Sequence, residues 1–356
     1  GRRRQTEESL VSSAARPAVS EGPERIPTLV AEEYDDIARR IAARMAEIIR
    51  ERNRAGRNAV LGLATGSTPI GIYRELIRFH REEGLDFSRV VTFNLDEYYP
   101  MTPDSLHGYQ RFMRENFFEH VNIDTRHAHI PRGDLSRSEI EAHCRDYERA
   151  IQEAGGIDLQ ILGIGQTGHI GFNEPGSSAT SRTRLVVLDT ITRRAAAADF
   201  FGTENVPVEA ITMGVGTILE AREVLLLATG EHKAVIVKRA VEGEIDHSVA
   251  ATYLQRHPNA MVYLDAAAAA ELTRVKTPWA LGEIAWTRPL EIQAVVWLSE
   301  VTNKSVLKLD DVDYRDHHLS ALLLRHGSSG ALNGIVFNAL IAKIRGRSKL
   351  PSQKRI

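Results

Sequence analysis

Short apolar segments alternate along this chain with longer segments in which apolar residues recur at helical spacing. The short segments have the length of buried strands, and longer ones such as 70–81 and 136–153 have the pattern of amphipathic helices. This alternation predicts an α/β fold with a doubly wound, mostly parallel sheet and helices on both faces, because parallel strands need crossover connections. The predicted strands are residues 59–63, 90–95, 159–164, 224–228 and 261–264.

Three regions differ along the 356 residues. Residues 1–27 mix Arg, Glu, Ser, Ala and Pro without periodicity, which predicts a flexible N-terminal extension. Residues 28–278 are predicted to form one large domain that begins with a surface helix over 31–52. The alanine run 266–270 is interpreted as a helix start. Residues 279–356 are predicted to be a helical appendage that ends in a polar linker.

Composition excludes several classes of protein. The 45 basic and 47 acidic residues give a net charge of -2. The sequence has no stripe of basic residues interleaved with aromatics, so no nucleic-acid partner is expected. No apolar run approaches the roughly 20 residues of a spanning helix, so no membrane partner is expected. The single cysteine, Cys144, cannot close an internal disulfide, which indicates a reducing, cytoplasmic compartment.

The glycine-rich segment Gly163–Pro175 carries the clearest chemical signal, a histidine and a carboxylate in one loop. It follows a predicted buried strand, and open α/β sheets bind ligands at the carboxyl ends of their strands. Imidazole exchanges protons near neutral pH, so His169, oriented by Glu174, is a candidate general acid/base; the alternative is a structural histidine. Pro175 stands where a dinucleotide-binding helix would continue, so no nicotinamide cofactor is expected.

A second strand end has the composition of an anion-binding loop. Small and hydroxyl residues lead from the strand to Pro69, a favoured first residue of a helix. Free backbone N–H groups, the helix dipole and the hydroxyls could hold a phosphate; alternatively, Ser67 or Thr68 only caps the helix. The candidate phosphate-binding residues are Thr65, Gly66, Ser67 and Thr68, joined by Lys233, which otherwise is an ordinary surface lysine.

Two adjacent carboxylates, Asp96 and Glu97, follow the predicted strand 90–95. Neighbouring side chains on an extended backbone point in opposite directions, so only one of the two is expected to face a cleft. The other would support it or face solvent, and a fully solvated pair is the alternative to any functional role. The histidines show no spacing typical of a metal site, so no metal is expected.

Taken together, several motifs resemble those of the glucosamine-6-phosphate deaminase (glucosamine-6-phosphate isomerase) family over about residues 30–276. The motifs are ATGSTP at 64–69, FNLDEY at 93–98, GHIGFNEP at 168–175, SRTR at 181–184 and MGVGT at 213–217. The resemblance implies the fold that these deaminases share with 6-phosphogluconolactonases and ribose-phosphate isomerases. It also implies conversion of glucosamine 6-phosphate and water to fructose 6-phosphate and ammonia in amino-sugar catabolism, without an organic cofactor, by a homo-oligomer. Residues from about 280 resemble the connector of proteins that join such a deaminase to a C-terminal de-N-acetylase-like domain, which is absent here.

Carried over residue by residue, the resemblance makes Asp96 the base that enolises the substrate, His169 the ring-opening residue and Glu174 its supporting acid. The chain departs from the family where Thr167 replaces an Asp and Asp199 replaces a phosphate-binding Arg. Lys233 and the hydroxyl loop, or alternatively Arg193 or Arg194, would then carry more of the phosphate binding. Val186 replaces a basic residue of the family's allosteric site, which leaves activation by N-acetylglucosamine 6-phosphate open. Two other readings remain, a catalytically impaired sugar-phosphate sensor and a lactonase or isomerase on the same fold.

Overall fold

The computed structural model describes residues 22–348 of the chain. The chain divides between Glu271 and Leu272 into two compact units. This boundary lies ahead of residue 279, where the sequence predicts the appendage to begin. Of the predicted N-terminal extension, residues 1–21 lie outside the described residues. Ile26, by contrast, is 2% exposed, and the N–H of Arg25 donates to the carbonyl of Val241, so this end of the extension packs on the first unit instead of standing free.

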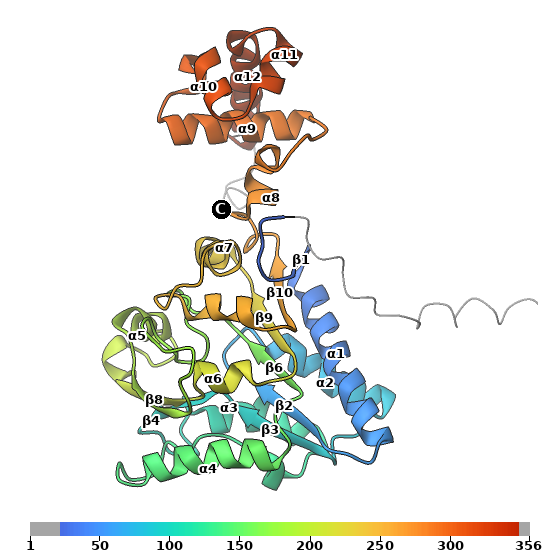
Figure 1. Ribbon diagram of the computed structural model, residues 1–356, viewed down its shortest axis with the longest axis vertical. Coiled ribbons are helices and arrows are strands. Elements are labelled where there is room, and N and C mark those ends of the chain that lie inside the picture. The colour runs from blue at the N-terminus through green and yellow to red at the C-terminus, as the bar shows by residue number, and fades with distance from the viewer. Residues whose placement is uncertain (1–21, 349–356) are drawn as a thin grey trace, which may run out of the picture. The chain divides into compact units, whose positions relative to one another are not determined.

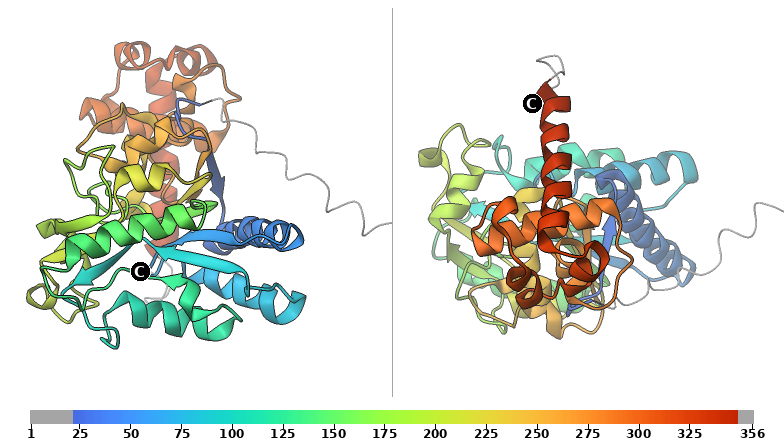
Figure 2. Two further views of the ribbon diagram at one scale, coloured as in Figure 1. Left: turned by 60° about the horizontal axis from the view of Figure 1, so that its bottom comes forward. Right: turned by 90° about the horizontal axis from the view of Figure 1, so that it is seen from above.

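The first unit is built on a seven-stranded sheet in which all neighbouring strands are parallel. Helices cover both of its faces (Figures 1 and 2). The predicted doubly wound fold is therefore confirmed. In spatial order the strands are β1 (Thr28–Ala31), β10 (Ala260–Asp265), β9 (Val224–Ala228), β6 (Leu159–Leu162), β2 (Ala59–Leu63), β3 (Val90–Asn94) and β5 (Ala128–His129).

The central strands form where the sequence is continuously apolar. Every residue of β2, β3, β6 and β9 is buried, as expected for parallel strands covered on both faces. Within the large sheet, the strands that the sequence did not predict are the short edge strands β1 and β5, which are less completely buried; the three strands of the small sheet described below were not predicted either. Their pattern is weaker because an edge strand has fewer neighbours to pack against.

The helices of this unit lie between the strands in sequence. The first, α1, buries a stripe of apolar side chains that includes Ile37, Ile41, Met45 and Ile49, at the spacing that the sequence predicts. The helices are α1 (Tyr34–Arg54), α2 (Ile70–Glu83), α3 (Tyr109–Asn116), α4 (Ile140–Glu153), α5 (Thr190–Ala196), α6 (Val215–Leu219) and α7 (Ala234–Glu242).

A second, antiparallel sheet of three strands, β4 (Asp96–Tyr99), β8 (Glu209–Thr212) and β7 (Arg184–Val187), lies beside the carboxyl edge of the large sheet. Only Leu95 separates β3 from β4, so the chain passes directly from one sheet to the other. Asp96 pairs with Thr212, and Thr212 pairs with Arg184 on its other side. This small sheet fixes the backbone of Asp96 at a strand end.

The order of the large sheet reverses between β2 and β6. From β2 the chain continues to β3 and β5 on one side, and it then returns to β6, β9 and β10 on the other. Connections that diverge from two adjacent strands leave a crevice at their carboxyl ends, which is where open α/β sheets bind ligands. The loops after β2 and β6 are the hydroxyl-rich and glycine-rich segments identified from the sequence.

The second unit is helical and has its own apolar core, to which Trp279, Leu298, Tyr314, Leu322 and Val336 contribute. It is thus more than the appendage and linker predicted from sequence, and its last helix continues through Ser348, into the polar tail that the sequence predicts to be a linker. Residues 349–356 of that tail lie outside the described residues. The helices are α8 (Thr273–Lys276), α9 (Arg288–Thr302), α10 (Asp311–Asp316), α11 (Ser320–His326) and α12 (Ser329–Ser348).

The alanine run 266–270 forms turns, so the prediction of a helix start there is wrong. The carboxylate of Asp265 accepts hydrogen bonds from the N–H groups of Ala268 and Gly230. A side chain that bonds nearby backbone donors in this way stabilises a turn in competition with a helix. Local hydrogen bonding by Asp265 therefore overrides the helix propensity of alanine.

Candidate active site

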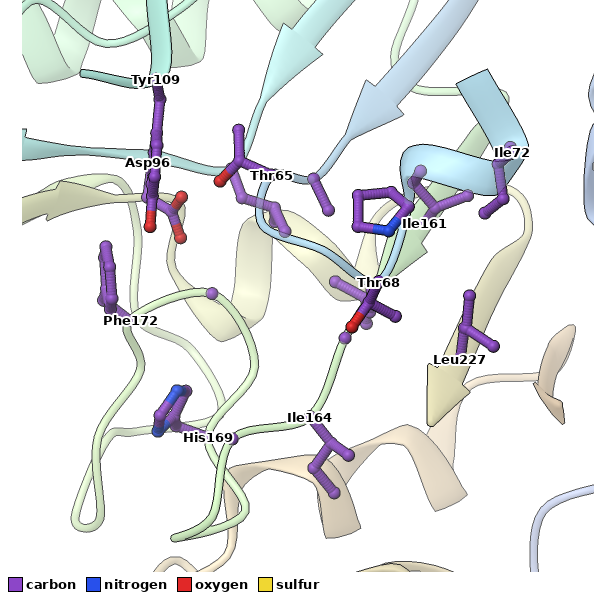
Figure 3. A pocket seen from close by; sticks show the side chains of 17 residues that line it. Thr65, Thr68, Ile72, Asp96, Tyr109, Ile161, Ile164, His169, Phe172 and Leu227 are labelled. Atoms are coloured by element: carbon purple, nitrogen blue, oxygen red, sulfur yellow. The ribbon is translucent and has the colours of Figure 1, made fainter. Parts of the chain in front are cut away.

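A cavity of about 200 Å³ opens at the carboxyl edge of the large sheet, where the strand order reverses. It is formed by the segments that follow β2, β3 and β6, and Figure 3 shows Asp96, Phe172 and His169 along one side of it. The structure thus brings residues from all three predicted motifs to one place. The polar side chains that line the cavity are Thr65, Thr68, Asp96, Tyr109 and His169.

Asp96 is the first residue of β4, and its side chain lines the cavity. The residue is 7% exposed, and its carboxylate has no hydrogen-bond donor among the described residues. Burial, with a smaller contribution from the charge of Glu97, raises the pKa of Asp96 to about 8. A desolvated carboxylate with a raised pKa is a strong proton acceptor in its ionised form.

Glu97 points away from the cavity and is 1% exposed. Its carboxylate accepts hydrogen bonds from the backbone N–H groups of Tyr98, Tyr109 and Gln110, at 2.9 to 3.1 Å. Two of these donors belong to the first turn of α3, where the helix dipole favours a negative charge. The solvated-pair alternative is therefore wrong, and Glu97 has a structural role beside Asp96.

His169 lies in the loop after β6, and its Nδ1 atom is surrounded by side-chain oxygens. Oγ1 of Thr167 lies 2.9 Å away, Oε2 of Glu174 lies 3.4 Å away and Oγ1 of Thr192 lies 3.5 Å away. Although burial alone would raise the pKa of Glu174, hydrogen bonding to His169 and the histidine's charge lower it overall. The pairing of His169 with Glu174 expected from sequence is present, and Thr167 lies beside both.

Two glycines in this loop make room for the neighbouring side chains. A Cβ atom on Gly165 would lie 2.1 Å from Nε2 of His169, so the imidazole can occupy its position only over a glycine. Gly171 has a φ of 55°, and a Cβ atom there would lie only 2.9 Å from Oγ1 of Thr212 and at an ordinary contact distance, 3.5 Å, from Oδ2 of Asp96. The loop therefore packs directly against both candidate catalytic residues.

Other motif residues hold the loop in place. The N–H of Phe172 donates to Oγ1 of Thr212, and the amide of Asn173 donates to the carbonyls of Ile170 and Met213. A guanidinium N–H of Arg184 donates to Oδ1 of Asn173. These contacts connect the glycine-rich loop to the small sheet that carries Asp96.

The hydroxyl-rich loop between β2 and α2 lies on the opposite side of the cavity. The sequence predicts Pro69 as the first residue of α2, whereas in the structure Pro69 is the N-cap and Ile70 is the first helical residue. No side chain caps this helix, so the capping alternative for Ser67 and Thr68 is wrong. The phenol of Tyr34 fixes the loop by donating to the carbonyl of Thr68 and accepting from the N–H of Gly71. Within the described residues, the N–H groups of Gly66, Ser67 and Thr68 have no protein acceptor.

Lys233 belongs to a second, adjoining cavity of about 310 Å³. Gly165 and His169 line both cavities, so the two meet at the imidazole. Burial lowers the pKa of Lys233, and its Nζ atom donates to the carbonyl of Ile164 at 2.7 Å. The structure therefore places Lys233 near His169 but not in the cavity that contains Thr65 and Thr68.

The three charged residues that the sequence relates to phosphate binding besides Lys233 lie outside both cavities as described. A guanidinium N–H of Arg193 donates to the carbonyls of Thr203 and Val206, both at 3.2 Å. Asp199 and Arg194 are exposed, and none of these three residues lines either of the two cavities as described. Among the described residues no group of three or more His, Cys, Asp or Glu side chains could hold a metal ion.

Sequence reasoning did not identify Tyr109 or Thr192. Tyr109 lines the cavity beside Asp96 and hydrogen-bonds with Thr65 and Tyr98. Thr192, on α5, is 7% exposed and reaches His169 from 23 residues away in sequence. Neither residue belongs to a local motif, so only the tertiary structure connects them with the site.

Comparisons with known proteins agree with this architecture. Residues 32–266 match the family described as glucosamine-6-phosphate isomerases/6-phosphogluconolactonase. Glucosamine-6-phosphate deaminase 2 of Bacillus subtilis is 47% identical over 247 residues, which are 68% of this chain and 96% of that protein. A glucosamine-6-phosphate deaminase-like protein of Bacteroides thetaiotaomicron is 44% identical over 323 residues, or 91% of this chain. The chain spans only 49% of that longer relative.

Solved structures give the same result. A monomeric glucosamine-6-phosphate deaminase is 40% identical, with a TM-score of 0.66, and the match covers 68% of this chain and 99% of that one. A 6-phosphogluconolactonase from Thermotoga maritima shares the fold at 23% identity, with a TM-score of 0.52 over 67% of this chain and 98% of its own.

None of the helices in residues 22–348 is both long and apolar enough to cross a bilayer.

Proposed function

Because the chain belongs to the family of glucosamine-6-phosphate isomerases and 6-phosphogluconolactonases, we propose that its site converts glucosamine 6-phosphate and water to fructose 6-phosphate and ammonia. The observation that carries this proposal is that Asp96 and His169 line one cavity, one as a buried carboxylate and the other as an imidazole held from its Nδ1 side. These are the two groups that the reaction needs. The proposed reaction belongs to amino-sugar breakdown.

The first chemical step is the opening of the sugar ring. A proton must leave the hydroxyl on C1, and the ring oxygen must gain one as the C1–O bond breaks. We assign both transfers to Nε2 of His169, because Nδ1 faces Thr167 and Glu174. Glu174 supports the imidazole from behind with its negative charge.

The second step moves a proton from C2 to C1. Ionised Asp96 removes the C2 proton while a proton passes from the substrate's ammonium group to O1, which gives an enolamine. As the neutral acid, Asp96 then delivers its proton to C1, which leaves an iminium group at C2. Water adds to C2, and the resulting carbinolamine loses ammonia to give the ketone of fructose 6-phosphate. No organic cofactor is required, because the transferred groups are protons, water and ammonia.

The phosphate group needs a site away from these reacting atoms. The backbone N–H groups of Gly66, Ser67 and Thr68 and the hydroxyls of Thr65 and Thr68 support a phosphate site on one side of the cavity. Lys233 would add a positive charge from the adjoining cavity once its amine leaves the carbonyl of Ile164. This assignment gives the phosphate both hydrogen bonds and one cation.

Ammonia release from glucosamine 6-phosphate by the purified chain tests the proposal directly. Unphosphorylated glucosamine and glucose 6-phosphate are the controls, since one lacks the phosphate and the other lacks the amine. Absence of ammonia with retained binding of glucosamine 6-phosphate would instead support a sugar-phosphate sensor. Hydrolysis of 6-phosphogluconolactone without ammonia release would support a lactonase, for which the likeness at 23% identity or below shows only the shared fold.

The proposal extends to location and assembly. We assign the protein to the cytoplasm, consistent with its sugar-phosphate substrate and its single buried thiol, Cys144. We also propose a homo-oligomer, although the structural neighbour described above is a monomer. Light scattering on the purified chain decides between the two states.

A further inference from the structure

The hydroxyl of Thr167 contacts both the imidazole of His169 and the carboxylate of Glu174. Its Oγ1 atom is 2.9 Å from Nδ1 of His169 and donates to Oε2 of Glu174 at 3.5 Å. The direct distance from Nδ1 to Oε2 is 3.4 Å, longer than a good charge-assisted hydrogen bond. Thr167 therefore makes the shortest polar contact of the imidazole ring.

The acceptors around Nδ1 favour one tautomer of His169. Glu174 also accepts from the backbone N–H of Asp189 at 3.1 Å, and its lowered pKa keeps it ionised at neutral pH, so its oxygens can only accept. The hydroxyl of Thr167 has one proton, and toward Glu174, at 3.5 Å, it can only donate that proton. Toward His169 the hydroxyl can then only accept, which requires the proton of the neutral imidazole to be on Nδ1.

With the proton on Nδ1, the lone pair of the neutral ring is on Nε2. This atom lies over Gly165, the glycine that lines both cavities. The tautomer thus presents a proton acceptor where the two cavities meet. The other tautomer would present an N–H group there and place two acceptors, Nδ1 and Oγ1, 2.9 Å apart with no proton between them.

We propose that Thr167 is a positioning residue that holds His169 in the Nδ1–H tautomer by bridging it to Glu174. An Asp at this position could accept from Nδ1 but, when ionised, could not donate to Glu174, and it would place a second negative charge beside the ring. A hydroxyl bridges the two groups without that charge. The role in turnover rests on the proposed deaminase function, whereas the tautomer does not.

Thr192 provides the internal comparison. Its hydroxyl also hydrogen-bonds with Glu174, but it lies 3.5 Å from Nδ1, so it contacts the ring more weakly than Thr167. It approaches from α5, on the side of the second cavity. If the bridge through Thr167 sets the tautomer, removal of the Thr192 hydroxyl has the smaller effect.

The test is ¹⁵N NMR of histidine-labelled protein, in which the shifts of Nδ1 and Nε2 report the tautomer without any substrate. The chain has 13 histidines, so His169→Asn identifies the signals of His169 by their loss. In Thr167→Val, which keeps the β-branched shape, we expect the ratio of Nδ1–H to Nε2–H tautomer to fall about five- to tenfold. Thr167→Ser should restore the ratio, Thr192→Val should lower it less, and the exposed Thr180→Val should leave it unchanged.

An unchanged tautomer ratio in Thr167→Val overturns the proposal, as does a loss in Thr167→Ser equal to that in Thr167→Val. Circular dichroism checks that the variants are folded, and Thr167→Ala replaces the valine variant if the latter unfolds. The deaminase function is tested separately, by ammonia release from the unmodified chain. If the tautomer ratio depends on Thr167 but the chain releases no ammonia, the deaminase function alone is refuted. If the chain releases ammonia but the tautomer ratio does not change in Thr167→Val, the positioning role alone is refuted.

Discussion

Asp96 and Glu97 are adjacent in sequence and both buried, yet only the carboxylate of Asp96 reaches the cavity, while that of Glu97 binds the first turn of α3. Alternation along β4 separates the two side chains. Their charges nevertheless interact, because the negative charge of Glu97 contributes to the raised pKa of Asp96. We therefore expect a change of Asp96 to affect proton transfer directly, and a change of Glu97 to act through the pKa of Asp96.

Asp96→Asn should abolish exchange of the C2 proton of glucosamine 6-phosphate with solvent and lower kcat by at least about 10²-fold, because the amide keeps the shape of the side chain but cannot accept a proton. Substrate binding should change little. Proton exchange measured by NMR in deuterated water, together with a binding titration, checks both parts. Exchange that persists in this variant would mean that another group is the base.

The rate should rise with pH through a value near 8. Burial raises the pKa of Asp96 to about 8, and only the ionised form can accept the C2 proton, so kcat/KM should increase about tenfold between pH 7 and pH 9. Glu97→Gln removes the neighbouring negative charge and should shift this inflection to lower pH. A pH profile of both proteins checks the sign, and a shift to higher pH in the variant would contradict the proposed coupling.

His169→Asn should impair a closed-ring substrate much more than a substrate supplied in the open form, since the proposed proton transfers by Nε2 end when the ring is open. The expected loss on the closed form is about 10²-fold or more. Steady-state rates on the two forms measure the difference. Equal losses on both forms would assign His169 to a later step.

Lys233→Ala should raise KM for glucosamine 6-phosphate, because loss of a charge-assisted contact costs about 1.5 to 3 kcal/mol. Unphosphorylated glucosamine should be almost unaffected. Arg193→Ala and Arg194→Ala are the matched comparisons: the guanidinium of Arg193 is bound to two backbone carbonyls, and Arg194 lines neither cavity among the described residues. An unchanged KM in Lys233→Ala with a raised KM in an arginine variant would place the phosphate elsewhere.

The second unit should unfold separately from the site. All three tryptophans of the chain, Trp279, Trp286 and Trp297, belong to it, so their fluorescence reports on this unit alone. Asn333 is 2% exposed, accepts from the phenol of Tyr314 and donates to a backbone carbonyl. Asn333→Ala should therefore lower the unfolding free energy of this unit by about 1 to 3 kcal/mol.

Denaturant titration followed by tryptophan fluorescence measures that change, with the exposed Asn338→Ala as the control on the same helix. Ammonia release by the folded variant should equal that of the unmodified chain. A parallel loss of activity would show that the two units are energetically coupled.

Local pattern in the sequence determined the central strands, the glycine-rich and hydroxyl-rich loops and the residues Asp96, His169 and Glu174. Buried parallel strands need continuous apolar residues, and a loop that approaches a ligand needs glycines, so both leave a signal in consecutive positions. The sequence also separated Asp96 from Glu97 through the alternation of an extended backbone. Alternation alone did not decide which of the two faces the cavity; the resemblance to the deaminase family selected Asp96.

Only the tertiary structure gave the physical cause of that choice, and with it the contributions of Tyr109 and Thr192. The choice depends on α3, whose N–H groups bind Glu97, and on the small antiparallel sheet, whose strands come from separate parts of the chain. Thr167, which the sequence presents as the loss of an acid, has in the folded chain a hydroxyl that contacts both His169 and Glu174. Hydrogen bonds between distant segments leave no periodic signal in the sequence, because they depend on where the fold places each donor and acceptor.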